Sequence, residues 1–398
     1  MYKIKQLPED FFVREIARHE FREKGDYAYY IMRKKNYTTQ RAAERVADFL
    51  GVKREDFSYA GLKDRNAVTE QFVSIRSRES PTEIKLPDIE LKLLGRGYVK
   101  IGIGELDGNE FKITVRNLEI SDIIRLYNRF AEEEMLEDFQ LSESGLKVLF
   151  NELKEITNSR GIFFPNYFGN QRFSKNNYEV GRSLLLRDFK GAINKILCFD
   201  IPEESVKNHW ENWDELLKIA RAESSKEILK HLSQNSRDYV GALRRIPKRI
   251  LRLYIGSFQA FLFNEALSAK VRSRFEKYFE VNYKLGRMAF PEKIIDKPNN
   301  EKISLPGFGS DKVDEQVSKI LEREGISQRS FIIREMPELS AEGTERDAFC
   351  AAERFTITGI SRDELNSGRF KIELSFYLRK GSYATILIDF LFGQNILN

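Results

Sequence analysis

Short alternating and amphipathic segments follow one another along the first part of the chain. Residues 10–16 and 27–33 have the apolar and aromatic composition that is typical of strands. After Thr38 or Thr39, either of which can cap a helix, apolar residues recur at helical spacing until Gly51, a typical stop. The apolar face of that helix would consist of Ala42, Ala43, Val46, Phe49 and Leu50.

Strand and helix patterns also succeed one another in the rest of the chain. We expect strands at 89–94, 99–104 and 111–116 and helices over most of 121–158 and 176–279. Two further strands, 370–377 and 378–390, are expected around the glycine break at Gly381. A mixture of this kind indicates an α+β protein, and 398 residues suffice for two or three domains.

The composition excludes several classes of protein. Hydrophobic residues make up 41% of the chain, which suits a folded protein, and no run approaches the roughly 20 apolar residues of a membrane span. The beginning of the chain has no apolar signal segment, so we expect a cytoplasmic location and no membrane partner.

Cysteine and histidine are too scarce for several kinds of site. Two cysteines do not make a disulfide framework, and the histidines have no metal-ligand spacing, so a zinc site or a histidine-based triad is disfavoured. Acid–base chemistry is therefore expected to rest on carboxylates. The residues concerned are Cys198, Cys350, His19, His209 and His231.

The net charge of +5 is a small difference between 66 basic and 61 acidic residues, so clustering matters more than the total. Each of two basic groups is either a solvated helix face or a surface for a polyanion. The first consists of Arg244, Arg245, Lys248, Arg249 and Arg252, and the second of Lys270, Arg272 and Arg274.

Residues 59–71 carry one acid, Asp64, in a glycine-broken loop between two strand patterns. A short turn between two rigid elements is a suitable mount for a reacting side chain. The flanking Lys63 and Arg65 favour an ionised carboxylate, which a nucleophile or a general base requires. A solvated turn of ordinary function has the same composition, and the residue types alone do not separate the two interpretations.

Two other segments combine unusual residues. Glycines in 102–108 place Asn109 and Phe111 at the mouth of a strand. Residues 161–173 bring several aromatics next to Gln171 and Arg172, a combination that can stack on unpaired bases and bind phosphate, or can simply pack at a domain junction. The aromatics of 257–264 favour a helix core over base stacking.

The amino-acid sequences of four segments resemble motifs of the TruD family of pseudouridine synthases. They are Ala60-Gly-Leu-Lys-Asp-Arg-Asn-Ala-Val-Thr-Glu-Gln71, Asn166-Tyr-Phe-Gly-Asn-Gln-Arg-Phe173, the Ser257-x-Gln-x-x-x-x-Asn264 pattern and Gly381-Ser-Tyr-Ala-Thr385, in the order of the family. The resemblance implies a catalytic domain with a mixed or antiparallel sheet, built from 1–158 plus 371–398. An α/β TruD-specific domain, 159–370, would be inserted into it.

The activity that the resemblance implies is isomerisation of uridine to pseudouridine in RNA, without a cofactor or a metal. The family's usual target is uridine 13 in the D-arm of tRNA. Eukaryotic relatives also act on other RNAs, and the large insert resembles the archaeal and eukaryotic branch, so the range of substrates stays open. No obligate protein partner is evident.

By motif match, Asp64 is the catalytic nucleophile, Phe111 is the surface on which the uracil stacks, and Asn109 orients either Asp64 or the base. Lys63 is expected to lower the pKa of Asp64 or to contact phosphate. Further substrate-binding candidates are Glu15, Gln171, Arg172 and Tyr383. Asp389 stands where relatives often carry Arg-Glu, a departure from the pattern of the last motif.

Two alternatives belong to other classes. An RNA-binding or RNA-chaperone protein of the same fold could have lost catalysis, although such a relic would not need Asp64, Asn109 and Phe111 together. A methyltransferase or nuclease would need a cofactor loop or a cluster of metal-binding acids. Gly102-x-Gly104 is too short for a dinucleotide fingerprint, and no acid cluster is obvious.

Overall fold

The computed structural model describes residues 1–77, 79–131, 143–158, 161–293, 298, 300–310 and 312–393. It contains two compact units, the first made of residues 1–164 and 351–392 and the second of residues 165–292 and 298–350. The first domain change, expected near residue 158, lies close to the unit boundary at 164, whereas the second, expected near residue 370, differs from the unit boundary at 350, because most of β13 (Phe349–Arg362) belongs to the first unit. The division into catalytic and inserted domains stays a prediction, because compactness assigns no function to either unit.

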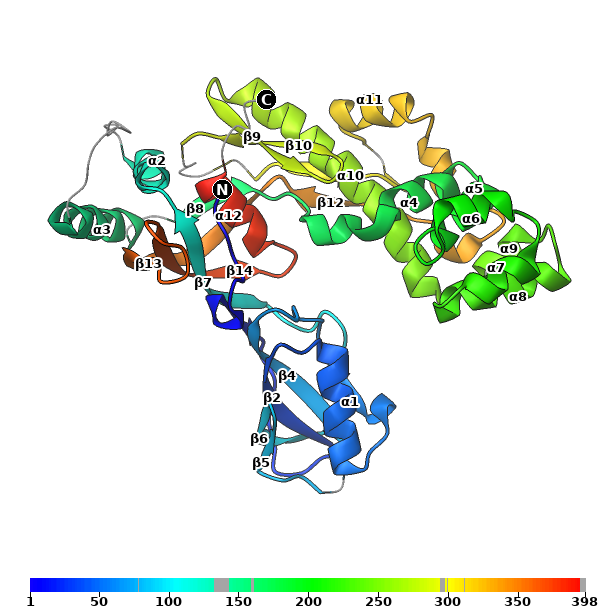
Figure 1. Cartoon of the computed structure of the whole chain (residues 1–398), viewed down its shortest axis with the longest axis horizontal. Coiled ribbons are helices and arrows are strands. Elements are labelled where there is room, and N and C mark those ends of the chain that lie inside the picture. The colour runs from blue at the N-terminus through cyan, green and yellow to red at the C-terminus, as the bar shows by residue number, and fades with distance from the viewer. Residues whose placement is uncertain are drawn as a thin grey trace. The chain divides into compact units, whose positions relative to one another are not determined.

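A mixed sheet runs through the first unit (Figure 1). Its strand order is β5-β6-β2-β4-β1-β7-β14-β13-β8, and β3 also pairs with β4. The β1–β4 pair is parallel, whereas β1–β7 and β7–β14 are antiparallel. The strands are β1 (Phe11–Ile16), β2 (Tyr27–Lys35), β3 (Phe57–Tyr59), β4 (Val68–Arg76), β5 (Glu83–Leu86), β6 (Ile89–Gly97), β7 (Gly108–Leu118), β8 (Ile162–Pro165), β13 (Phe349–Arg362) and β14 (Phe370–Arg379).

Helix α1 (Thr39–Leu50) packs along one face of β2, β4 and β6 (Figure 1). The helix begins where the side chain of Thr38 accepts a hydrogen bond from the N–H of Arg41 at 3.2 Å, and it ends at Gly51 with φ +64°. These limits confirm the capping residues expected from sequence. The core beneath the helix includes Tyr30, Met32, Ala42, Ala43, Val46, Val73 and Leu91.

Three sequence expectations for this unit are wrong. Residues 99–104 form an irregular loop, because the glycines that flank Ile103 interrupt the pairing of a strand. Phe49 is 58% exposed, so it lies outside the apolar face of α1. Residues 384–392 form a helix, α12 (Ala384–Phe392), in place of a strand. That segment is buried almost all round, and a short apolar run has no periodicity that separates a strand from a buried helix.

The expected helical region over 121–158 corresponds to α2 (Ile120–Phe130) and α3 (Glu143–Asn158); residues 132–142 lie outside the described part of the chain.

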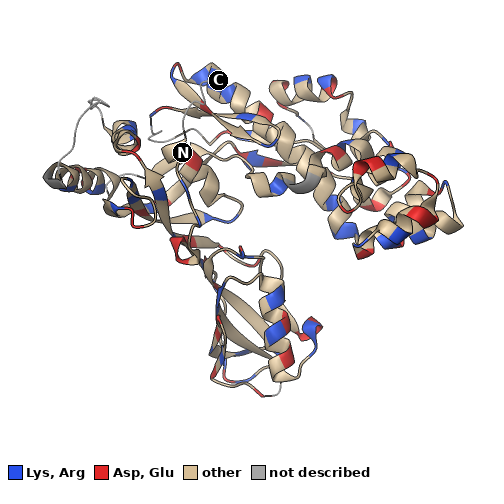
Figure 2. Cartoon of the chain, in the orientation of Figure 1, with Lys and Arg blue, Asp and Glu red and all other residues tan. Residues whose placement is uncertain are grey.

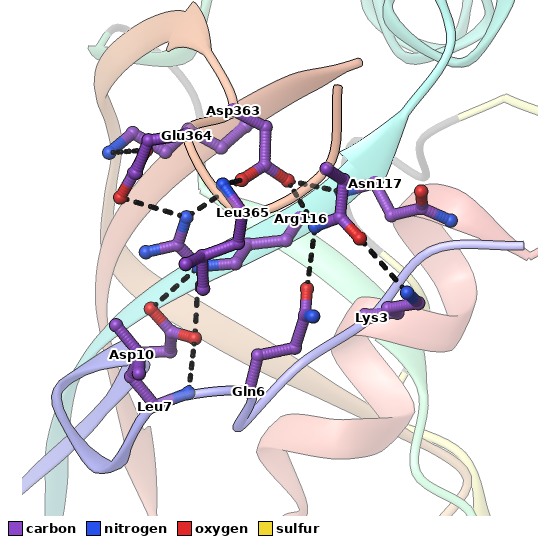
Figure 3. Close-up of polar contacts among 11 residues, drawn as sticks. Lys3, Gln6, Leu7, Asp10, Arg116, Asn117, Asp363, Glu364 and Leu365 are labelled. Atoms are coloured by element: carbon purple, nitrogen blue, oxygen red, sulfur yellow. Dashed lines mark hydrogen bonds and ion pairs between the residues drawn. The ribbon is translucent and has the colours of Figure 1, made fainter. Parts of the chain in front are cut away.

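The first unit is also held together by a buried ion-pair network (Figure 3). Arg116 on β7 contacts Asp10 before β1, and Asp363 and Glu364 between β13 and β14. The network therefore ties together segments from both ends of the sequence.

The second unit is mainly helical. Its longest helix, α10 (Lys248–Arg274), packs against α4, α11 and one strand from each of two small two-stranded sheets. Pro247 is the N-cap residue of α10, and Phe258, Phe261, Leu262 and Phe263 are buried, as expected of core residues. The other elements are α4 (Asn177–Leu185), α5 (Phe189–Leu197), α6 (Glu203–Asn208), α7 (Trp213–Ile219), α8 (Glu223–Gln234), α9 (Tyr239–Leu243), α11 (Glu315–Arg323), β9 (Tyr278–Tyr283) with β10 (Gly286–Pro291), and β11 (Lys302–Leu305) with β12 (Thr344–Asp347).

Candidate active site

The Asp64 loop connects β3 to β4, and two buried polar side chains hold its backbone in place by hydrogen bonds. Thr39, at the start of α1, accepts a hydrogen bond from the N–H of Lys63 at 2.9 Å and donates its hydroxyl to Gln71 at 2.9 Å. The amide nitrogen of Gln71 in turn donates to the carbonyl oxygen of Gly61 at 3.1 Å. Since Thr39 and Gln71 are both fully buried, these bonds define the path of the loop backbone.

Two lysines that are distant in sequence converge on Asp64. The Nζ of Lys5 lies 2.9 Å from Oδ2 of Asp64, whose side chain is 41% exposed and thus accessible to a substrate. The Nζ of Lys34 donates to the backbone carbonyl of Asp64 at 2.8 Å and to that of Tyr37 at 2.6 Å. One lysine therefore neutralises the carboxylate while the other positions the backbone that carries it.

Both lysines are in unusual environments. Lys34 is fully buried, and burial lowers its pKa to about 8, although the negative charge of Asp64 opposes the shift. Lys5 adopts φ +59°, which is uncommon for a residue other than glycine, and its ammonium lies 4.1 Å from the ring centre of Phe11. Strained backbone of this kind is concentrated at functional sites.

Glu15 and Lys63 form a buried ion pair beside the loop. The Nζ of Lys63 donates to one carboxylate oxygen of Glu15, and the N–H of Phe72 donates to the other at 3.3 Å. The side chains of Glu15 and Lys63 are 0% and 8% exposed. This contact attaches the loop to the end of β1. In the described structure, the ammonium of Lys63 thus serves to position the loop, and its contact with phosphate stays a prediction.

Asn109 and Phe111 lie on β7 next to Glu15. Asn109 is the antiparallel partner of Glu15, and Phe111 is the partner of Val13, so all four side chains lie on one face of the sheet. The Oδ1 of Asn109 is buried, and no hydrogen-bond partner lies near it within the described residues. Such an unmet acceptor is rare in a folded protein and is available to a ligand.

Phe111 belongs to an aromatic cluster. Its ring stacks on that of Phe376 with 5.3 Å between centroids and meets the edge of Phe11 at 6.1 Å. The side chain is largely buried. Because Phe11 also contacts Lys5, the cluster is continuous with the cations around Asp64.

The three remaining candidates belong to other segments of the chain. Tyr383 immediately precedes α12 in the first unit, and its carbonyl accepts the N–H of Ile386 at 3.1 Å. Gln171 and Arg172 belong to the second unit, where Gln171 is exposed. Arg172 lies with its guanidinium carbon 5.9 Å from the ring centre of Phe168, and its Nε is buried without a hydrogen-bond partner among the described residues. Their roles stay predictions.

In the second unit, one cation of the first basic group and the cations of the second group contact acids. Arg244 contacts Glu338 at 3.2 Å, and Lys270 and Arg272 contact Glu301 and Glu280 at 2.7 and 2.8 Å. Figure 2 shows basic and acidic residues interspersed along these helices. The pairing favours the interpretation of solvated helix faces for these three cations. Over the described ranges, no cluster of three or more His, Cys, Asp or Glu could hold a metal ion, and no helix is long and apolar enough to cross a membrane.

Sequence reasoning missed Lys5, Lys34, Thr39 and Gln71. Lys34 had a signal: in 28–34 every second residue is buried, so the alternation places Lys34 inward with Tyr30 and Met32. The others had no comparable signal, because their contacts with the Asp64 loop depend on the fold.

The chain is similar to known proteins along most of its length. A family model described as tRNA pseudouridine synthase D (TruD) matches residues 2–283 and 301–389. A relative from Methanocaldococcus jannaschii named "Probable tRNA pseudouridine synthase D 2" is 29% identical, over 97% of this chain and 90% of its own. A relative from Aquifex aeolicus named "tRNA pseudouridine synthase D" is 26% identical, over 99% of both. A crystal structure of a TruD protein from Methanosarcina mazei has a TM-score of 0.69 at 26% identity, covering 98% and 93% of the two chains.

The α+β fold, with its mixed sheet and an additional unit, is that of a pseudouridine synthase, an isomerase. Within this class the chain belongs to the TruD family, which the family model matches along most of its length.

Proposed function

We propose that the chain converts uridine 13 in the D-arm of tRNA to pseudouridine, with Asp64 as the nucleophile. The observation that carries the proposal is the position of Asp64. Its partly exposed carboxylate is paired with Lys5 and stands on a loop whose backbone is bonded to buried side chains. A nucleophile needs both access to the substrate and a rigid support.

The reaction needs no net oxidation and no group donor, because pseudouridine is an isomer of uridine. Asp64 attacks the ribose or removes a proton from it, and the bond between N1 of uracil and C1′ of ribose breaks. The base turns, and C5 forms the new bond to C1′ while the bond between Asp64 and the ribose breaks, or while Asp64 returns the proton that it removed from the ribose. C5 then loses its proton while N1 gains one, which balances the reaction. We therefore propose a mechanism without a cofactor.

Asn109 and Phe111 complete the proposed site. The unmet Oδ1 of Asn109 can accept a hydrogen bond from the N3–H of uracil, which would orient the base during its rotation. Phe111 supplies an aromatic surface against which a flipped uracil can lie, in the cluster with Phe11 and Phe376. A phenylalanine has no hydroxyl, so its part is confined to stacking.

The substrate is proposed from the family and from the names of relatives, which specify tRNA. Uridine 13 is the finer part of the proposal, and further RNAs stay open. Gln171, Arg172 and Tyr383 are proposed RNA contacts, and Lys63 and Glu15 are proposed to support the Asp64 loop beside the bound uridine. We also propose a cytoplasmic location and no obligate protein partner.

The test is pseudouridine formation on unmodified tRNA, mapped to the nucleotide, by the wild type, Asp64→Asn and Asp48→Asn. Asp48 is an exposed acid on α1 and serves as the matched control. We expect modification at uridine 13 by the wild type and the control, and none by Asp64→Asn, which should still bind the RNA. Full activity of Asp64→Asn would refute the mechanism. RNA binding without activity in all three proteins would favour the inactive RNA-binding alternative.

A further inference from the structure

A hollow in the first unit lies between the segment that joins β1 to β2 and the loop that joins β6 to β7. It encloses about 290 Å³, and its lining includes His19, Tyr29, Tyr98 and Lys100. Ligand pockets usually enclose roughly 300–1,000 Å³, so this one has room for a single planar group of nucleobase size.

The hollow is separate from the Asp64 site. Neighbouring residues of a strand point to opposite faces of the sheet. On β4, Gln71 supports the Asp64 loop, whereas Phe72 contacts the ring of His19 at 5.1 Å. The hollow therefore lies on the face of the sheet opposite to α1 and the Asp64 loop.

Aromatic rings form its wall. The ring of His19 lies nearly parallel to that of Tyr29, with 6.2 Å between centroids and 22° between planes. The hydroxyl of Tyr29 donates to the carbonyl oxygen of Val99, which attaches the β6–β7 loop to the wall. At the rim, Tyr98 is 59% exposed, so its ring is accessible to a ligand.

One of the lining residues, His19, also carries an unmet polar atom. The Nε2 of His19 is buried, and nothing within the described ranges of the chain lies at hydrogen-bond distance from it. Buried nitrogen atoms are nearly always paired in folded proteins. A ligand with polar edges would supply the missing partner, and a purely apolar ligand would not.

Cations at the rim suit a polyanion. Arg18, Arg22 and Lys100 line the hollow together with two acids, Glu20 and Glu105. The ion pairs of Arg22 with Glu20 and of Arg18 with Asp107 are exposed and long, at 3.5 and 3.8 Å. Surface pairs of this kind contribute little, so a phosphate group can replace the carboxylates.

We propose that this hollow binds a second unpaired nucleobase of the RNA, with Tyr98 stacking on the base and His19 contacting its edge. The inference rests on the proposed function, because it takes the RNA substrate as the ligand. The β6–β7 loop is bonded to the first residue after β3 and to the last residue of β1: Gly104 N–H to Ala60 O at 2.7 Å, and Asp107 N–H to Ile16 O at 2.9 Å. One RNA strand that follows this loop can thus reach both sites.

The experiment measures affinity for an unmodified tRNA transcript and for transcripts with one abasic ribose at successive positions around the target uridine. The proteins are the wild type, Tyr98→Ala, His19→Ala and Phe49→Ala. Phe49 is the matched control, because it is an equally exposed aromatic on α1. We expect Tyr98→Ala to bind about tenfold more weakly, the scale of one base–aromatic stack, and Phe49→Ala to bind like the wild type.

The decisive result is coupling. At one position, replacing the base by an abasic ribose should weaken RNA binding by the wild type about as much as Tyr98→Ala does. The same abasic transcript should bind Tyr98→Ala no more weakly than the complete transcript does. Pseudouridine formation by Tyr98→Ala at saturating RNA should remain at the wild-type rate, which also reports an intact fold. If no abasic position couples to Tyr98, or if Tyr98→Ala binds like the wild type, the inference is overturned. Failure of the proposed function would be distinct, since the wild type itself would then form no pseudouridine.

Discussion

Arg116→Met is expected to cost the first unit much of its stability. Arg116 is almost fully buried, and its Nε lies 2.9 and 3.0 Å from the two carboxylate oxygens of Asp10 (Figure 3). One terminal nitrogen lies 2.9 Å from Asp363 and 3.1 Å from Glu364. Methionine retains much of the apolar stem but removes every one of these contacts. Two carboxylates, those of Asp10 and Asp363, would remain buried without their cation.

The size of the loss follows from the burial of both partners. Removal of one member of a buried ion pair costs about 3–5 kcal/mol. Asp363 keeps hydrogen bonds from the N–H groups of Asn117 and Leu365, which places the expected loss near the low end, about 3 kcal/mol. For a unit of this size each kcal/mol corresponds to roughly 2–4 °C, so the melting temperature should fall by about 6–12 °C.

Arg14→Met is the matched control, because it also removes an arginine–carboxylate pair from this sheet. The Arg14–Glu70 pair is 2.7 Å long, but half of the arginine side chain is exposed. Exposed pairs contribute about 0–1 kcal/mol, so the control should melt within a few degrees of the wild type. Thermal unfolding followed by circular dichroism at neutral pH compares the two variants. Equal losses would refute the reasoning.

The same network predicts a pH dependence. Burial alone would raise the pKa of Asp363, but hydrogen bonds from Asn117, Leu365, Asn366 and Arg116 lower it to about 2. The carboxylate of the unfolded chain titrates near 4, so this contribution is complete above that pH and is lost as pH falls through about 2. The difference between the wild type and Arg116→Met should therefore shrink in acid. A difference that is unchanged at about pH 2 would contradict the assignment.

Three further changes probe other parts of the first unit. Lys34→Met removes the hydrogen bond to the carbonyl of Asp64, so kcat should fall about tenfold or more with RNA affinity unchanged; weaker binding at an unchanged kcat would argue against a positioning role. Gly108→Ala would place a Cβ 2.3 Å from the carbonyl oxygen of Leu378, so strand pairing must shift and both melting temperature and kcat should drop; unchanged values would refute the clash. Burial raises the pKa of Asp389 to about 6, so unfolding free energy should decrease by about 2–3 kcal/mol from pH 4 to 6 in the wild type and not in Asp389→Asn; equal pH profiles would exclude this group.

Local signals predicted much of the fold. The caps of α1 and the strands β2, β6 and β7 follow from patterns within a few residues, and the structure has them near the expected positions. The errors arise where the outcome depends on distant parts of the chain. The segment 384–392 is helical because neighbours bury it all round, and nothing in its own apolar residues separates that environment from the interior of a sheet.

The site was predictable to a different degree. The amino-acid sequence of its loop identified Asp64 as a candidate, and the flanking cations of Lys63 and Arg65 were expected to stabilise its ionised carboxylate. In the structure the cations in contact with Asp64 are Lys5 and Lys34, which lie 59 and 30 residues away in sequence. Lys63 turns instead to Glu15. Lys63 and Asp64 are adjacent in the loop, but the direction of each side chain depends on the strands that pack against the loop.

The contacts that support the Asp64 loop determine what the Asp64→Asn substitution can show. Thr39, Gln71 and Lys34 bond to backbone atoms of the loop, at Lys63 N, Gly61 O and Asp64 O, and none of these three bonds involves the carboxylate. Asp64→Asn alters only the carboxylate, so the loop should keep its path and lose only the ion pair with Lys5. Loss of activity in that variant would then measure the chemistry of one side chain. The loop is thus supported through its backbone atoms and the proposed chemistry rests on the carboxylate, and this separation makes the substitution informative.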